Sequence, residues 1–200
     1  MVILLWKRRK LFIRGLIAFS SLIFINTIFI FMQLLISSSQ LQLIINRLAQ
    51  QLIENDDSIA NTIFIGIQPR GIFISDKIIE QIKLLCPTEK VNYGLLDITF
   101  YRDDVRSEIH VPNKTDIPFS IDGKKVILID DVLYTGRTIR AALDALQDFG
   151  RPKKVELCVL VNRRFDRELP IQPNFYGKII DSHIEEKVKV DKEKGEVVIY

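Results

Sequence analysis

Cysteine and histidine are scarce in this chain of 200 residues, which contains two of each. Neither pair has the spacing of a metal site, so a zinc site built from Cys and His is excluded. A single disulfide between Cys86 and Cys158 is possible, but apolar residues flank both thiols. We expect both to be small core residues of an intracellular enzyme. His110 and His183 are expected on the surface or in loops.

An excess of positive charge is missing from most of the chain, although its formal net charge is +3. Residues 1–31 hold five basic residues and no acidic one, which leaves 23 basic against 25 acidic residues in 32–200. The basic character therefore belongs to the first segment. The remainder is long enough for one domain with a hydrophobic core, and it has no overall positive field to attract nucleic acid.

Charge is absent altogether from residues 15–36, which follow a basic cluster at 7–10. This run is long enough to span a bilayer with a cytoplasmic amino terminus, which would carry the remaining chain across the membrane. Almost no linker separates it from the first amphipathic helix. We therefore expect residues 1–31 to be translated sequence upstream of the real start at Met32, with a membrane anchor through 15–36 as the alternative. A cleaved signal peptide is disfavoured, because no clear small-residue cleavage site follows the run.

The expected organisation is an apolar leader at 1–38 and a single domain at 39–200. Within the domain, apolar runs that read as buried strands alternate with helical patterns, which predicts an α/β fold with a mainly parallel, doubly wound sheet. Ser39 and Gln42 have capping-box spacing at the start of the first helix. The polar stretch 102–116 predicts a mobile loop or flap, and 188–200 a hairpin. Strands are expected at 62–67, 93–101, 125–129 and 155–161, and helices at about 40–54, 72–85 and 138–149.

The most informative segment is 126–138, where an apolar strand delivers Asp130 and Asp131 and a helix follows at once. Between them, Thr135 and Gly136 allow backbone N–H groups to wrap a phosphate at the helix N-terminus. The two aspartates are placed to accept from ribose hydroxyls and to hold Mg²⁺ through water. No Gly-x-x-x-x-Gly-Lys is present, so this is not a Walker loop. An ordinary βα turn capped by aspartate explains one polar residue but not the whole run.

The wording Asp-Asp-Val-Leu-Tyr-Thr-Gly-Arg-Thr at 130–138 resembles the phosphoribosyl pyrophosphate motif of type I phosphoribosyltransferases, in the form typical of the pyrimidine operon regulator family. The resemblance covers about 39–190 and includes 66–71, 96–104, 148–152 and 167–171. It implies the type I phosphoribosyltransferase fold with a flexible flap, and a Mg²⁺-dependent uracil phosphoribosyltransferase that converts uracil and phosphoribosyl pyrophosphate to UMP and pyrophosphate. A purine or orotate enzyme would share 126–138, but not the flap and the 167–170 motif.

The resemblance also implies the roles of individual residues. Asp130 and Asp131 would hold the ribose and, indirectly through substrate or water, the metal. Arg70 and Arg102 would contact pyrophosphate, and together with the two aspartates they form the expected catalytic set. Base recognition falls to Arg163 and the backbone near Val188. The substrate-binding residues implied are Pro69, Arg70, Gly71, Asp130, Asp131, Val132, Leu133, Tyr134, Thr135, Gly136, Arg137, Thr138, Arg163 and Val188.

The chain departs from the family pattern in three places. Pro69 stands where relatives usually have Thr or a similar residue, and Asn162 begins a longer segment where relatives have Asp-Arg and shorter spacing. Base recognition is therefore less firmly implied than phosphate recognition.

The third departure concerns RNA, which relatives bind to regulate pyrimidine genes. Asn46, Gln50 and Gln172 occupy positions where RNA-binding relatives tend to have Thr, His and Arg, although Arg47 and Lys178 remain. Because lost phosphate contacts weaken RNA binding, we expect catalysis to be retained and attenuation to be weak or absent. The alternative is a UMP-sensing RNA-binding regulator with little catalysis. Homo-oligomerisation and a cytoplasmic location are also expected.

Overall fold

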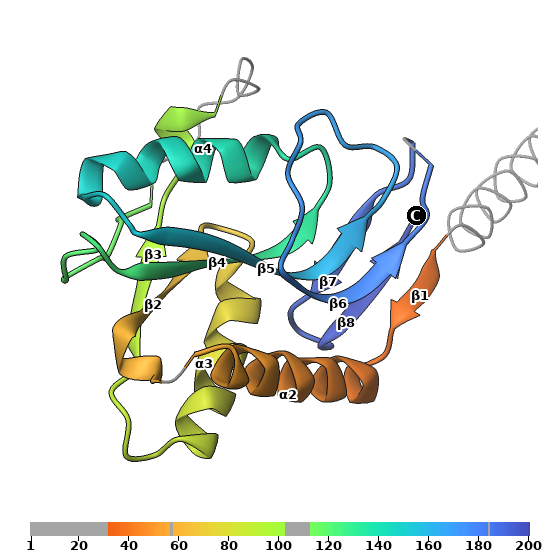
Figure 1. Cartoon of the computed structure of the whole chain (residues 1–200). Helices are drawn as coiled ribbons and strands as arrows, with labels where there is room; N and C mark the ends of the chain where they lie inside the picture. Colours follow the sequence, from red (N-terminus) through yellow and green to blue (C-terminus); the bar gives the residue numbers. More distant parts are fainter. Residues whose placement is uncertain (1–31, 57, 103–112, 184) are drawn as a thin grey trace, which may run out of the picture.

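The central feature of the computed structural model, which describes residues 32–56, 58–102, 113–183 and 185–200, is a five-stranded parallel sheet. Its strand order is β3-β2-β4-β5-β6, with helices on both faces (Figure 1). The predicted α/β architecture with a parallel, doubly wound sheet is thus confirmed. The strands are β2 Thr62–Ile67, β3 Asn92–Leu96, β4 Lys125–Leu133, β5 Lys154–Arg163 and β6 Phe175–Ile180.

The two faces of the sheet are sorted by the alternation of side chains along each strand. In β2, Phe64 packs into the core on one face, whereas Ile63 and Ile65 pack into the core on the other. The first core is covered by α2 Ser38–Glu54 and α3 Ile72–Leu85, and the second by α4 Arg137–Leu146, which η3 Gln147–Phe149 extends. Since both faces are covered, the central strands read as continuous apolar runs.

Strand β4 runs further than predicted. It continues to Leu133 rather than ending at residue 129, so Asp130 and Asp131 lie inside the strand, with Asp130 opposite Val159 of β5. The predicted strand at 93–101 is wrong in its second half, because β3 ends at Leu96 and η2 Thr99–Tyr101 follows. The carboxylate of Asp97 turns the chain there by accepting hydrogen bonds from both the backbone N–H and the hydroxyl of Thr99.

The N-cap of helix α2 lies two residues earlier than predicted. Ser37, rather than Ser39, is the N-cap, and Gln40 completes the capping box. The Ser37 backbone N–H donates to Gln40 Oε1 at 3.0 Å, and the Gln40 N–H donates to Ser37 Oγ at 3.4 Å. Both cysteines are free thiols, and Cys158 is fully buried, as expected of a small core residue.

A second, antiparallel sheet joins the two ends of the described chain in the order β1-β8-β7. The predicted C-terminal hairpin is confirmed as β7 Val188–Asp191 and β8 Glu196–Ile199. Strand β1 Gln33–Ile36 pairs with β8, although these residues were expected to belong to the apolar leader. Among the helices in the described ranges, none combines the length and hydropathy needed to cross a membrane. Residues 1–31 of the leader and 103–112 of the predicted flap lie outside the described residues.

Candidate functional site

Most of the expected site residues lie where the parallel strands end, whereas Arg102 follows η2 and Val188 lies in the second sheet. Strand β2 leads into the turn at 68–71, β4 leads into the loop at 134–136, and β5 ends at Arg163. Helices α3 and α4 begin directly after the first two of these loops (Figure 1). Because carboxyl ends of parallel strands share one edge of a sheet, three segments distant in sequence meet there.

Gly71 brings the turn after β2 against β4. A Cβ atom at this position would lie 2.7 Å from the carbonyl oxygens of Ile67 and Ile129 and 3.1 Å from Cα of Asp130, all backbone atoms that cannot yield easily. Only glycine allows so close an approach. Arg70 and Pro69 are exposed on this turn, and the Gln68–Pro69 peptide is cis.

Asp130 and Asp131 are both buried, with 3% and 9% of their surface exposed. The backbone N–H of Asp131 donates to Asp130 Oδ1 at 2.9 Å, and that of Val132 donates to Asp131 Oδ1 at 2.7 Å. Burial raises the pKa of Asp130 well above its usual value, and the neighbouring charge of Asp131 raises it further. Burial also raises the pKa of Asp131, while the charge of Arg70 works in the opposite direction at both groups. A ligand that brings hydroxyl donors or positive charge would therefore stabilise the ionised pair.

Mg²⁺ is compatible with this pair of carboxylates. Within the described part of the chain, no three or more His, Cys, Asp and Glu side chains are grouped to hold a metal ion, so the protein provides no closed cage there. Mg²⁺ usually needs none, because it keeps several waters and binds through one or two carboxylates and substrate phosphates. The hard oxygen atoms of Asp130 and Asp131 are of that type.

The loop between β4 and α4 presents backbone N–H groups at a helix N-terminus. Gly136 is the N-cap of α4 and adopts the left-handed conformation with φ 95°. As a glycine it provides no side-chain hydrogen bond to the first turn of the helix. The Arg137 N–H donates to Thr135 Oγ1 at the long distance of 3.4 Å. The first turn of α4 thus has the partial positive charge and the donors that bind phosphate. Val132 and Leu133 end the strand that leads to this loop, and Thr138 lies in the first helical turn.

Residues 167–169 lie behind this loop, a placement that the sequence motif did not reveal. The Arg167 guanidinium donates to the carbonyl of Tyr134 and to Asn162 Oδ1. The backbone N–H groups of Glu168 and Leu169 both donate to the Thr135 carbonyl, at 3.0 and 3.2 Å. The Glu168 carboxylate forms an ion pair of 2.6 Å with Arg137.

Arg163 has a different environment from the one expected of a base-contacting residue. Its side chain is buried, forms an ion pair of 2.9 Å with Asp166, and donates to the carbonyls of His183 and Glu186, each at 2.9 Å. Its guanidinium lies 3.9 Å from the centre of the Tyr134 ring. The hydrogen bonds of Arg163 therefore order the surrounding chain. Val188 pairs with Ile199 in the second sheet and packs against the core under α2.

Asp97 connects the two sides of the predicted flap, whose residues 103–112 are outside the described ranges. On one side it holds Thr99, three residues before the exposed Arg102. On the other, Asp97 Oδ2 accepts from the Asn113 N–H at 3.0 Å, and the Asp97 N–H donates to Thr115 Oγ1 at 3.0 Å. A single buried carboxylate thus brings both ends of this segment together.

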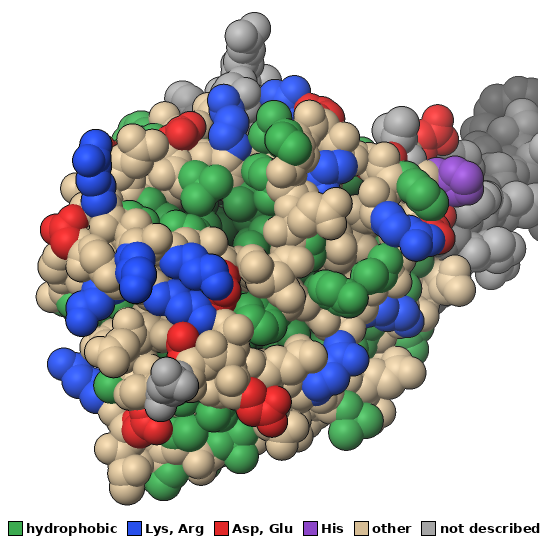
Figure 2. Space-filling model, in the orientation of Figure 1, with side chains coloured by type: hydrophobic (Ala, Val, Ile, Leu, Met, Phe, Trp, Pro, Cys, Tyr) green, Lys and Arg blue, Asp and Glu red, His purple; other side chains and the backbone are tan. Residues whose placement is uncertain are grey.

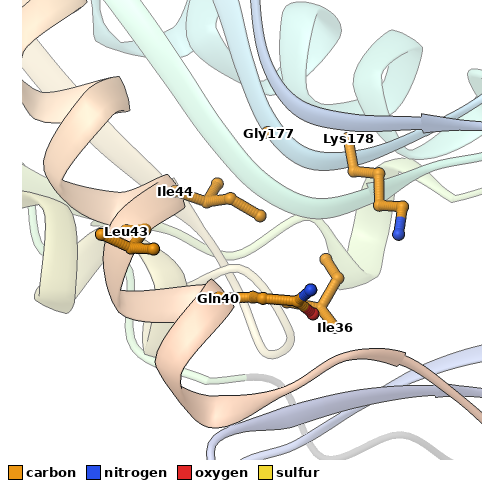
Figure 3. Close-up of a pocket in the computed structure, with 6 residues that line it drawn as sticks. All are labelled: Ile36, Gln40, Leu43, Ile44, Gly177 and Lys178. Atoms are coloured by element: carbon orange, nitrogen blue, oxygen red, sulfur yellow. The ribbon is translucent and has the colours of Figure 1, made fainter.

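The basic residues considered for RNA contact bind the protein itself. Arg47 of α2 donates to the carbonyls of Tyr176 and Gly177 in β6, and Lys178 donates to the carbonyl of Leu35 at 2.9 Å. Lys178 also borders a cavity of about 250 Å³, shown in Figure 3, which contains none of the expected site residues. The cavity is lined by Ile36, Gln40, Leu43, Ile44, Gly177 and Lys178.

Comparison with known proteins gives consistent matches. Residues 37–193 match the phosphoribosyl transferase domain family. The chain is 47% identical over 157 residues to the Bifunctional protein PyrR of Picosynechococcus sp., and 47% identical over 160 residues to that of Latilactobacillus sakei. Each alignment covers 78% of this chain and 88% of the relative.

Solved structures show the same fold at lower sequence identity. A hypoxanthine phosphoribosyltransferase from Staphylococcus aureus matches with a TM-score of 0.59 and 23% identity, over 74% of this chain and 77% of the other. A hypoxanthine-guanine phosphoribosyltransferase from Bacillus anthracis matches with a TM-score of 0.60 and 20% identity, over 76% and 84%. The expected type I phosphoribosyltransferase fold is confirmed.

Proposed function

Because this chain belongs to the phosphoribosyl transferase family, and within it to the bifunctional PyrR proteins, we propose that it transfers the phosphoribosyl group of phosphoribosyl pyrophosphate to uracil. The products are UMP and pyrophosphate. The observation that carries this proposal is the placement of two buried aspartates directly before a loop and a helix N-terminus that offer phosphate donors.

The 5-phosphate binds at the loop 134–136 and the first turn of α4. Backbone N–H groups of Thr135, Gly136, Arg137 and Thr138 supply the donors, and the helix dipole favours the negative charge. Asp130 and Asp131 accept hydrogen bonds from the ribose hydroxyls, and their ionised forms are the stronger acceptors. Substrate binding thus replaces the water that burial has removed from these carboxylates.

Arg70 and Arg102 pair with the pyrophosphate group. The close packing of Gly71 on β4 keeps the turn that contains Arg70 near Asp130, and this supports a role for the Arg70 charge at the leaving pyrophosphate. Mg²⁺ held through water or substrate by Asp130 and Asp131 would neutralise charge on the pyrophosphate as it departs. In the transfer, the bond from C1 of the ribose to the pyrophosphate oxygen breaks, the bond from C1 to uracil N1 forms, and the N1 proton passes to solvent.

The uracil ring lies on the side of Tyr134 and Arg163. The hydrogen bonds of Arg163 to the carbonyls of His183 and Glu186 order the backbone that leads to Val188, so we assign Arg163 an ordering role at this subsite. The proposed substrates are cytosolic metabolites, which agrees with a cytoplasmic location. We also expect the protein to form a homo-oligomer.

Regulation through RNA is the second candidate function, because the relatives are named bifunctional. Arg47 and Lys178 donate to backbone carbonyls, and residues 32–200 carry no positive excess, so we propose weak RNA binding at most. Filter binding of a pyrimidine leader RNA at low and high salt measures this. Tight and sequence-specific binding would contradict the proposal.

The enzymatic proposal is tested with radiolabelled uracil, phosphoribosyl pyrophosphate and Mg²⁺. The expected result is UMP formation that needs all three components, with hypoxanthine and orotate failing as acceptors in parallel reactions. Transfer to hypoxanthine but not to uracil would show that the base specificity is wrong. Absence of any transfer would contradict the proposed catalysis.

A further inference from the structure

We propose that Arg167 is a positioning residue that orients the phosphate-binding loop without touching the substrate. The inference rests on the proposed function, because it concerns how the loop at 134–136 comes to present its N–H groups to the 5-phosphate. It gives the 167–169 segment a role in substrate binding that its sequence alone did not indicate.

The guanidinium of Arg167 joins two neighbouring strand ends. One of its terminal nitrogens donates to the Tyr134 carbonyl in the loop after β4. The other donates to Asn162 Oδ1 at 2.7 Å and to the Arg163 carbonyl at 3.1 Å, both at the end of β5. The planar fork of arginine suits such a bridge, which a single ammonium group cannot reproduce.

The two residues after Arg167 hold the next peptide of the loop. The N–H groups of Glu168 and Leu169 converge on the carbonyl of Thr135. Leu169 also packs close to Gly136: a Cβ atom added at position 136 would lie 3.3 Å from the Cβ atom of Leu169. The carbonyls of Tyr134 and Thr135 are therefore both directed toward the 167–169 segment.

The geometry of a trans peptide converts this into an orientation of donors. Within each peptide plane the C=O and N–H bonds point in opposite directions. When the carbonyls of Tyr134 and Thr135 point toward 167–169, the N–H groups of Thr135 and Gly136 must point away from it. Fixing acceptors on one side of the loop thus preorganises donors on the other, which lowers the entropic cost of binding phosphate.

Arg164, which directly follows β5 and lies three residues before Arg167, is a matched control because it is an arginine in a different environment. Its guanidinium pairs with Asp181 at 2.6 Å, and both side chains are more than half exposed. It also lies over the ring of Phe165. Removing it changes the charge of the protein by the same amount as removing Arg167, but leaves the loop carbonyls bonded.

The test measures steady-state kinetics and the affinity for ribose 5-phosphate on the full chain. In Arg167→Ala, we expect KM for phosphoribosyl pyrophosphate and Kd for ribose 5-phosphate to rise together by about tenfold or more, since bonds from a charged donor are lost. KM for uracil should change much less, and amide exchange at 135 and 136 should accelerate. Arg167→Lys should recover part of the affinity, and Arg164→Ala should match the wild type.

Unchanged ribose 5-phosphate affinity in a folded Arg167→Ala protein would overturn the inference, as would an equal loss in Arg164→Ala. If Arg167→Ala does not fold, Asn162→Ala serves instead, since it removes one acceptor and should raise Kd about threefold; no rise would have the same meaning. A wild type that binds ribose 5-phosphate, with the variant binding more weakly, but transfers nothing to uracil would support this inference while refuting the proposed function.

Discussion

At the amino ends of β4 and β5 the buried carboxylate of Glu156 and the partly buried carboxylate of Asp56 meet cations. At the carboxyl ends the two buried aspartates accept hydrogen bonds from backbone N–H groups. Lys125 Nζ lies 3.0 Å from both Asp56 and Glu156, and Lys154 Nζ lies 2.5 Å from Glu156. Asn55 donates to the same glutamate at 2.8 Å. Figure 2 shows Lys and Arg side chains gathered where these strands begin.

The pKa shifts at the two ends have opposite directions. Burial opposes ionisation of Glu156, but hydrogen bonds from Lys154 and Lys125 prevail and lower its pKa. At the other end, burial prevails and raises the pKa of Asp130 and Asp131. The amino end is thus compensated within the protein and contributes stability, whereas the carboxyl end retains charge that a ligand must compensate. Carboxylates whose pKa is raised by burial in this way are expected at functional sites.

The largest effect is expected from Asp131→Asn, which removes charge at the carboxyl end with almost no change of shape. The amide can still accept from the Val132 N–H, so the fold should persist with stability equal to or slightly above that of the wild type. Because the ribose loses a charged acceptor, kcat/KM for phosphoribosyl pyrophosphate should fall about a hundredfold or more. Initial rates and thermal melts on the same samples measure both. An unchanged rate would count heavily against the site.

Glu156→Gln makes the corresponding change at the amino end and should produce the opposite result. With Glu156 neutral, Lys125 loses one of the two carboxylates, Asp56 and Glu156, with which it forms ion pairs, and we expect a loss of roughly 1–3 kcal/mol in the free energy of unfolding. KM for phosphoribosyl pyrophosphate should not change. Lys154→Gln is the control, because its side chain is 61% exposed and an exposed pair contributes little. Urea titration gives the stabilities, and a raised KM in Glu156→Gln would break the separation between the two ends.

The free energy of unfolding should depend on pH in opposite ways at the two ends of the strands. Asp130 and Asp131 bind more protons in the folded than in the unfolded chain, so without ligand the free energy of unfolding should fall as pH rises from their usual pKa of 3.8 toward the folded values. The contribution of Glu156 is present above its usual pKa of 4.5 and is lost as pH falls through the lowered folded value.

Urea titrations across this window on the wild type, Asp131→Asn and Glu156→Gln resolve the two slopes. Asp131→Asn should weaken the loss of stability on raising pH, and Glu156→Gln should weaken the loss on lowering it. The affinity for phosphoribosyl pyrophosphate should also decrease as acid protonates the aspartates. Identical slopes in all three proteins would mean that neither shift is real.

Local patterns in the sequence predicted what depends on neighbours in the chain. Two examples are the continuous apolar run of β2 and the Asp-Asp pair before a Thr-Gly loop. In each, the residues of the segment itself are enough to predict its local structure. The cap of α2 was misplaced because Ser37-Ser38-Ser39 offers the same spacing twice, with Gln40 and with Gln42. Strand β1 ends at Ile36, directly before the Ser37 cap, and its pairing with β8 is not visible in any local pattern.

Contacts between distant residues were the part that could not be predicted. Strand β6 escaped because its residues are of mixed exposure, at an edge of the sheet. The bond from Arg167 to Tyr134 joins residues 33 positions apart, so the sequence motif at 167–171 could identify a family without revealing the contact. Arg163 was likewise expected at the base-recognition site, and its hydrogen bonds to the carbonyls of His183 and Glu186 join residues that are 20 or more positions apart.

The smallest expected effect tests how far the carboxyl-end region extends. Lys192, in the turn of the β7–β8 hairpin, donates to the Pro69 carbonyl at 3.4 Å, next to Arg70. Its charge therefore lies near the proposed pyrophosphate position, but it is exposed to solvent and screened. Lys192→Ala should raise KM for phosphoribosyl pyrophosphate about two- to threefold at low salt and less at physiological salt.

Lys194→Ala removes the same charge from an exposed position in the same turn, and it should leave KM unchanged. An equal rise in both variants would show that net charge, rather than the contact with Pro69, governs the effect. If KM in Lys192→Ala equals that of the wild type even at low salt, the hairpin does not contribute to pyrophosphate binding. The proposed site then extends no further than the turn after β2. A rise in KM confined to Lys192→Ala would show that the second sheet contributes to the binding of phosphoribosyl pyrophosphate.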